Sequence, residues 1–81
     1  MLNELKTGPR VVGAKQVKRA IDSASAVRVF LAADADPKVT EPVELLCREK
    51  GIPVETGAAM KELGAACGIS VGAAVAALVK A

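Results

Sequence analysis

Hydrophobic and polar positions follow two different periods along this chain, and the alternation of the two predicts helices and strands in turn. Segment 14–24 has apolar residues at helical spacing, so we expect a helix with one buried stripe. Segment 26–33 reads AVRVFLAA and is almost continuously apolar, as expected of a strand that is covered on both faces. The helical stripe consists of Val17, Ala20, Ile21 and Ala24.

Asp36 followed by Pro37 predicts the start of a further helix, because the carboxylate can accept from free backbone N–H groups and proline suits the first helical position. We expect this helix to run to Lys50, with a break or bend at 40–42, and to end at Gly51. The resulting β-α-β-α-β-α-β order predicts an α/β fold with helices on both faces of a four-stranded sheet. The other expected elements are strands at 10–13, 52–56 and 73–80, the last of them central, and a helix at 59–68.

A chain of 81 residues is expected to form a single domain, here residues 1–81, and its composition narrows what that domain can do. Apolar residues make up 52%, which argues against disorder, yet there is one Phe and no Trp, Tyr or His. Without imidazole the chain lacks the most common general base and zinc ligand, and with a single aromatic ring it lacks the stacking platform of single-strand binders. We therefore expect no catalytic residue, no metal site and no cofactor.

The remaining reactive side chains have simpler interpretations than catalysis. Asp34 and Asp36 have no third ligand or histidine nearby, and Asp36 is accounted for as a helix cap. Ser70 has no histidine to activate it. Cys47 and Cys67 form no C-x-x-C motif and lie in apolar helical contexts, so we expect buried free thiols rather than a disulfide.

No targeting or membrane segment is expected. The first ten residues, MLNELKTGPR, are charged and lack the apolar core of a signal peptide. The longest mainly apolar run, 73–79, is far too short to span a bilayer. The sequence therefore predicts a cytoplasmic protein without a membrane partner.

Positive charge gathers near the N-terminus, although the whole chain carries a formal net charge of only +2. Five Lys or Arg against two Asp or Glu leave residues 1–25 at +3, which indicates an anionic partner there. Segment 13–19, GAKQVKR, puts much of this charge at an expected helix start, where free N–H groups and the helix dipole also favour anions. A helix start of this kind can bind phosphates and base edges together. The alternative interpretation of the same residues is an ordinary solvated helix face.

Segment 64–72, GAACGISVG, raises a similar choice. Ile69 and Val71 flank Ser70 between two glycines, either as a tight connection whose apolar side chains fill the core or as a loop tip that contacts a ligand. We expect a division of roles, in which one apolar side chain anchors the loop inward and the other faces outward.

Four motifs, VVGAKQVKRAI, FLAADADP, LLCREKGIPV and KELGAACGISVGAA, occur in order over nearly all of the chain. In order and spacing they resemble the kink-turn RNA-binding ribosomal protein family, the L7Ae group, and most closely its small bacterial branch of the YbxF and YlxQ type. The resemblance implies a three-layer α-β-α sandwich with a mixed sheet that binds RNA without catalysis. It also implies a monomer whose partner is a structured RNA containing a kink-turn, with ribosomal RNA as one candidate.

In that family a G-x-N-E-x-x-K segment enters the major groove of the kink-turn at its tandem sheared G·A pairs. Here Gly13 matches the glycine, Lys15 the Asn, Gln16 the Glu and Arg19 the Lys. Lys15 and Gln16 depart from the archaeal pattern and are similar to the bacterial branch; a lysine donates but cannot accept. The family's second contact is a loop that covers a flipped-out nucleotide. The resemblance thus predicts as RNA-binding residues Gly13, Ala14, Lys15, Gln16, Lys18 and Arg19, with Ile69, Ser70 and Val71 of the loop.

Two other function classes stay open from the residues themselves. One is a nucleotide- or phosphate-binding enzyme or sensor domain that uses the helix start at Gly13. The other is a protein-interaction domain that has kept the fold and lost RNA binding. Titration with a kink-turn RNA, a mutant lacking the G·A pairs, and ATP separates the three.

Overall fold

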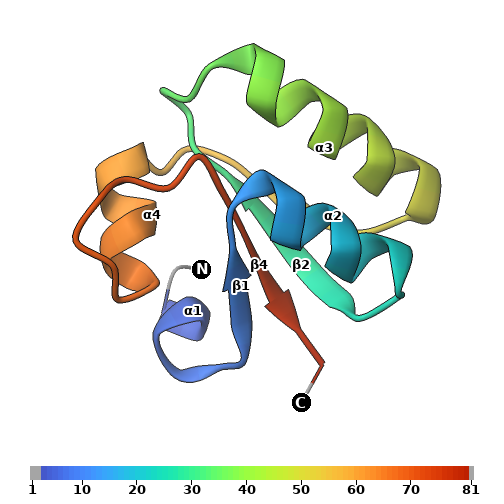
Figure 1. Ribbon diagram of the computed structural model, residues 1–81, viewed down its shortest axis with the longest axis horizontal. Coiled ribbons are helices and arrows are strands. Elements are labelled where there is room, and N and C mark those ends of the chain that lie inside the picture. The colour runs from blue at the N-terminus through green and yellow to red at the C-terminus, as the bar shows by residue number, and fades with distance from the viewer. Residues whose placement is uncertain (1–2, 81) are drawn as a thin grey trace.

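The computed structural model describes residues 3–80, which form one four-stranded sheet with helices on both sides (Figure 1). A short helix precedes the first strand, and from there strands and helices alternate as the sequence predicts. The elements are α1 (Asn3–Thr7), β1 (Arg10–Val12), α2 (Ala14–Asp22), β2 (Ala26–Leu31), α3 (Pro37–Lys50), β3 (Val54–Glu55), α4 (Met60–Ala66) and β4 (Val75–Val79). The α/β class is confirmed. Helix α1 was not predicted, because a segment as short as 3–7 shows no helical period.

The sheet is mixed, with the strand order β1-β4-β2-β3. Strand β4 runs antiparallel to both β1 and β2, whereas β3 runs parallel to β2. The expectation of a central strand at 73–80 is therefore confirmed. Val12 pairs with Ala76 and Leu31 with Val75, so β1 and β2 end where β4 begins.

Two hydrophobic clusters, one on each face of the sheet, make the three layers. Helices α2 and α3 cover one face, and α1 and α4 cover the other (Figure 1). Along β2 the side chains of Val29 and Leu31 enter the α2–α3 cluster, whereas Phe30 enters the α1–α4 cluster. Strand β4 alternates in the same way, which is why both strands read as continuously apolar. The three-layer α-β-α sandwich is confirmed.

Helix α3 is continuous through Pro42, so of the break or bend expected at 40–42 the break does not occur. Proline removes one backbone donor, but the turns on both sides are held in place. Asp36 caps the start through its carboxylate, and Val43 and Cys47, one turn apart, are fully buried in the α2–α3 cluster. The helix ends as expected at Gly51, whose φ of 70° lies in the left-handed region.

Helix α2 ends at Asp22, two residues earlier than expected, and Ala24 is exposed rather than part of the buried stripe. The backbone turns because the N–H of Ala24 donates to the Ile21 carbonyl at 3.1 Å and that of Ser25 to the Ala20 carbonyl at 2.9 Å. This pair of bonds is the Schellman arrangement, which puts Ala24 at a φ of 60°. The other three residues of the stripe are buried as expected.

Both thiols are free and buried, as the sequence predicts. Cys47 belongs to the α2–α3 cluster and Cys67 to the α1–α4 cluster, so the sheet separates them. Burial raises the pKa of each thiol, and the nearby Glu44 carboxylate adds to the rise in the pKa of Cys47. No helix within residues 3–80 combines the length and the apolar character needed to cross a bilayer.

Candidate functional site

The two segments singled out in the sequence lie at the same end of the sheet. Helix α2 begins directly after β1, and the loop 68–72 leads toward the start of β4. The N–H of Gly13 donates to the carbonyl of Val75 at 2.9 Å, which ties the helix start to the first residue of β4. Strand pairing between β1 and β4, far apart in the chain, thus brings the two segments to one edge of the molecule.

Position 13 needs a glycine because of its backbone conformation, not because a larger side chain would lack space. Its φ is +97°, a conformation that side chains with a Cβ rarely adopt, while nothing lies within 4 Å of where that Cβ would be. Its carbonyl accepts from the Val17 N–H at 3.0 Å and begins the helix. The first turn of α2 has no acidic side chain and no side-chain cap, so its amino end keeps the partial positive charge of a helix start.

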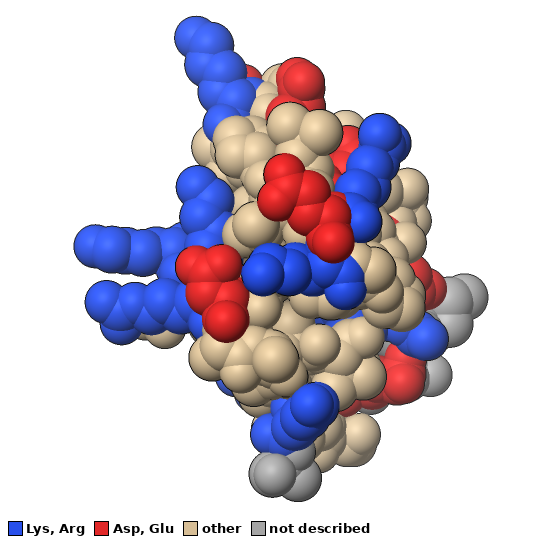
Figure 2. Space-filling view, turned by 90° about the vertical axis from the view of Figure 1, so that its right-hand side faces the viewer, with Lys and Arg blue, Asp and Glu red and all other residues tan. Residues whose placement is uncertain are grey.

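The polar side chains of α2 all face solvent. Lys15, Gln16, Lys18 and Arg19 are exposed, Ala14 is half-buried, and the stripe between them packs on the sheet. Gln16 and Arg19 are three residues apart, as are Lys15 and Lys18, so the four form two adjacent rows on the helix surface. Figure 2 shows Lys and Arg side chains projecting together from one side of the molecule, while charges of both signs mix on the face toward the viewer.

The loop 68–72 divides its apolar residues between core and solvent. Ile69 is half-buried and packs against the α1–α4 cluster. Val71 is 69% exposed, and Ser70 beside it is exposed as well. The expected inward and outward roles therefore go to Ile69 and Val71 respectively. An exposed valine at a loop tip is available for an apolar contact with a ligand.

The loop is held firmly by α4, so the position of Val71 is defined. The N–H of Gly68 donates to the Ala65 carbonyl at 3.0 Å, and that of Ile69 to the Gly64 carbonyl at 3.1 Å. These two bonds are again a Schellman ending, with Gly68 at a φ of +77°. Gly64 allows the loop to return so closely that a Cβ there would overlap the carbonyl oxygen of Val71.

Two further side chains support the site, and sequence reasoning missed their roles. The guanidinium Nε of Arg10, on β1, donates to the carbonyl of Cys67 at 3.1 Å and braces the end of α4. The carboxylate of Asp34 accepts from the Met60 N–H at 2.7 Å and caps the start of α4, while Asp36 caps α3 as expected. Both aspartates therefore have structural roles.

The fold and the four sequence motifs together indicate membership of a known protein family. The sequence profile of the Ribosomal protein L7Ae/L30e/S12e/Gadd45 family matches residues 2–81. This chain belongs to that family. The resemblance noted in the sequence is confirmed for its fold and its membership.

Relatives of this L7Ae-family chain carry names that refer to RNA. The RNA-binding protein YbxF of Geobacillus stearothermophilus is 41% identical over 76 residues, which cover 94% of this chain and 93% of the relative. An RNA-binding protein of Caldanaerobacter subterraneus subsp. tengcongensis is 47% identical over 68 residues, 84% of this chain and 83% of the relative.

Solved structures of other proteins share this fold. The 15.5 kD RNA-binding protein of Giardia lamblia superimposes with a TM-score of 0.92 at 33% identity, over 99% of this chain and 71% of that one. A Bacillus halodurans protein of unknown function has a TM-score of 0.88 at 24% identity, over 99% and 84% of the two chains, and supports the fold alone.

Proposed function

We propose that this protein binds RNA without catalysis and recognises a kink-turn, the motif built on tandem sheared G·A pairs. The observation that carries the proposal is the meeting of two chemically different surfaces at one end of the sheet. One is the exposed polar start of α2, and the other is the loop tip with Val71 69% exposed. The RNA-binding names of YbxF and of the Giardia protein support RNA as the partner.

The start of α2 supplies the polar contacts in this proposal. Its free N–H groups and the ammonium groups of Lys15 and Lys18 attract phosphates. Arg19 can donate twice to O6 and N7 of a guanine, and the Gln16 amide can both donate and accept at a base edge. Because Gln16 and Arg19 lie one turn apart, the two side chains can reach neighbouring bases. Lys15 adds donors only, so acceptance at the G·A pairs falls to Gln16.

The loop supplies the apolar contact. A sharply bent RNA exposes an unstacked base, and specific RNA recognition commonly targets such bases. The exposed side chain of Val71 can cover the face of that base, and the hydroxyl of Ser70 can bond to base or sugar. Ribosomal RNA is a candidate source of the motif because the family description names ribosomal proteins.

The proposal is tested by titrating the protein with a kink-turn RNA, with the same RNA after disruption of the G·A pairs, and with ATP. We expect tight binding of the first only, and a loss of affinity in the triple variant Lys15→Ala, Gln16→Ala, Arg19→Ala. Each contact that reads a base edge is worth roughly 1–3 kcal/mol, so the Arg19→Ala change alone is expected to weaken binding about fivefold or more.

The matched control is the double variant Lys6→Ala, Arg48→Ala, which removes the same number of positive charges from exposed positions on α1 and α3. It is expected to bind nearly as the parent does. Equal affinity of the parent for the intact and the G·A-disrupted RNA contradicts kink-turn recognition. Tight ATP binding by the parent instead supports a nucleotide-binding domain.

A further inference from the structure

A shallow hollow of about 550 Å³ lies beside α2, on the side of the helix that faces the open edge of β1. It begins at Gln16 and Arg19 and continues past Ser23 to the far end of β4. Val11 forms part of its floor, and Ser25 and Lys80 bound its distal end. The hollow therefore starts within the proposed base-reading surface and leads away from it along the helix.

The charges around the hollow favour an anion. Arg19 stands near one end and Lys80 near the other, and no Asp or Glu belongs to its lining among the described residues 3–80. The backbone of Lys80 is fixed beside the hollow because its N–H donates to the Ser25 carbonyl at 2.9 Å, and its side chain is exposed. Asp22 lies outside this lining, in the adjoining hollow that Lys80 also borders. Two separated cations on a lining without a carboxylate suit a chain of phosphates better than a single buried ion.

The two serines add a feature that points to ribose. Ser23 Oγ and Ser25 Oγ lie 3.0 Å apart, and each also donates toward the Ala20 carbonyl, at 3.3 and 3.2 Å. Because a hydroxyl has one hydrogen and two lone pairs, donation within this group leaves the serine oxygens able to accept a further hydrogen bond. Such an oxygen can accept a hydrogen bond from a ribose 2′-hydroxyl, the group that distinguishes RNA from DNA.

We infer that this hollow is a second RNA contact, which holds the sugar-phosphate backbone of the strand that leaves the α2 start, with Lys80 and Arg19 on phosphates and Ser25 on a 2′-hydroxyl. The inference rests on the proposed function and extends it beyond the kink-turn itself. From Gln16 to Ser23 the helix rises about 10 Å, at 1.5 Å for each residue, and Lys80 lies beyond. The contact therefore requires a stem that continues past the G·A pairs.

The test compares two RNAs, one trimmed close to the G·A pairs and one with both stems extended. The variant Lys80→Ala is expected to lose affinity about three- to tenfold for the extended RNA at 0.1 M salt and to keep its affinity for the trimmed RNA. The slope of log affinity against log salt should fall in magnitude by about one for the extended RNA. The discrimination between intact and disrupted G·A pairs should stay as in the parent.

Lys6→Ala is the matched control, because Lys6 is an exposed lysine on α1, across the sheet. Equal effects of Lys80→Ala and Lys6→Ala on the extended RNA overturn the inference, while tight binding of kink-turn RNA by the parent leaves the proposed function in place. A parent that binds neither RNA contradicts the proposed function instead. Saturable binding of AMP at the hollow, lost in Lys80→Ala, assigns it to a free nucleotide and also overturns the inference.

The ribose contact has its own test. Replacing the extended-stem riboses with 2′-deoxyriboses is expected to weaken binding to the parent and to leave binding to the Ser25→Ala variant unchanged. Melting temperatures of both variants are measured alongside, because the Ser25 hydroxyl also bonds to the Ala20 carbonyl. Equal sensitivity of parent and Ser25→Ala to the deoxy substitution contradicts the ribose contact.

Discussion

Two residues of one loop show how burial divides structural from functional roles. Ile69 and Val71 are both apolar and only two positions apart, yet Ile69 packs against the α1–α4 cluster and Val71 is 69% exposed. Removal of an exposed apolar side chain lowers the stability of the protein little, whereas removal of a packed one leaves a cavity. The two side chains can therefore be tested separately by equivalent truncations.

We expect Ile69→Ala to lower the free energy of unfolding by about 1–3 kcal/mol through lost burial, and to weaken RNA binding only as far as the loop loosens. Val71→Ala is expected to leave the melting temperature almost unchanged and to weaken kink-turn binding several-fold. Melting temperature and dissociation constant are measured for both variants. If the affinity loss of Val71→Ala accompanies an equal stability loss, the loop is a structural connection and the second RNA contact does not exist.

At the level of elements, α2 and α4 end with the same hydrogen-bond arrangement but with different residues. In α4 the left-handed position is occupied by Gly68, with a φ of +77°. In α2 it is occupied by Ala24, with a φ of 60°. A Cβ in this conformation contacts the following carbonyl oxygen, which costs roughly 1–2 kcal/mol. The strained backbone of Ala24 therefore offsets part of the stability that the hydrogen bonds at the end of α2 provide.

Ala24→Gly is expected to raise the free energy of unfolding by about 0.5–1 kcal/mol, because relief of the strained backbone exceeds the added entropy of the unfolded chain. The reverse exchange, Gly68→Ala, serves as its counterpart and is expected to lower stability. Urea unfolding of both variants checks the pair. A loss of stability in Ala24→Gly contradicts the strain. Neither change touches a side chain proposed to bind RNA.

Over the whole molecule, the sheet keeps the two thiols on opposite sides and away from water. Burial raises the pKa of both, so the folded protein holds these protons more tightly than the unfolded chain does. The chain has no His and no Tyr, and therefore few other side chains change charge at mildly alkaline pH. The thiols are therefore expected to contribute most of the pH dependence of stability in that range.

We expect the free energy of unfolding to fall as the pH rises above about 8.5, the ordinary thiol pKa, because only the unfolded chain then releases the protons. The slope has an upper limit of about 1.4 kcal/mol per pH unit for each thiol. Urea unfolding from about pH 7.5 to about pH 9.5, with reductant present, measures it.

The double variant Cys47→Ala, Cys67→Ala is the control, and its stability should vary little over the same range. An equal slope in parent and variant means that other groups cause the dependence. Reductant by itself is expected to leave the parent's melting temperature unchanged, since both thiols are free.

The sequence alone determined the alternation of elements, because burial imposes a period of two on a strand and of 3.6 on a helix. It identified β4 as a central strand, since side chains on both of its faces are buried and few polar residues are tolerated there. It also identified the start and end of α3, because Asp36 and Gly51 act on backbone groups within a few residues of themselves. For the site, it located the exposed polar row at the start of α2, which is a local feature of that helix.

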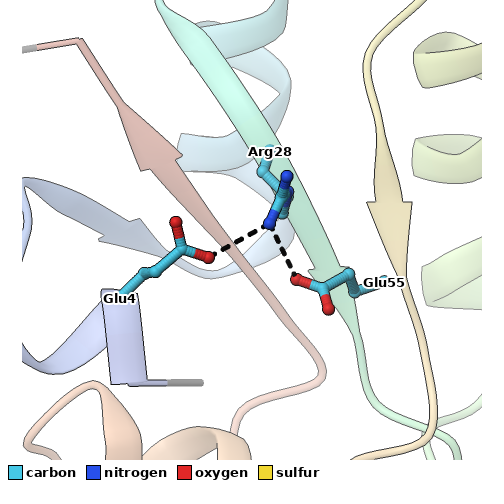
Figure 3. A network of polar contacts seen from close by, with 3 residues as sticks. All are labelled: Glu4, Arg28 and Glu55. Carbon is cyan, nitrogen blue, oxygen red and sulfur yellow. Dashed lines mark hydrogen bonds and ion pairs between the residues drawn. The ribbon is translucent and has the colours of Figure 1, made fainter. Parts of the chain in front are cut away.

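The tertiary structure decided what depends on contacts between distant segments. Whether Ile69 or Val71 faces the core follows from the return of the loop over Gly64, which the spacing of apolar residues does not show. Helix α1 exists because Leu5 is fully buried in the α1–α4 cluster, and a five-residue segment shows no period of its own. The same holds for the Glu4–Arg28–Glu55 contacts, at 3.1 and 3.4 Å, which join α1, β2 and β3 (Figure 3).

The supporting contacts of the site were beyond sequence reasoning for the same reason. Arg10 reaches the Cys67 carbonyl across 57 positions of sequence, and Asp34 reaches the Met60 N–H across 26. Such partners become neighbours only through the strand order β1-β4-β2-β3, which joins the ends of β1 and β2 to the start of β4. A local pattern of polar and apolar residues fixes which face of an element is buried, but strand pairing decides which elements meet.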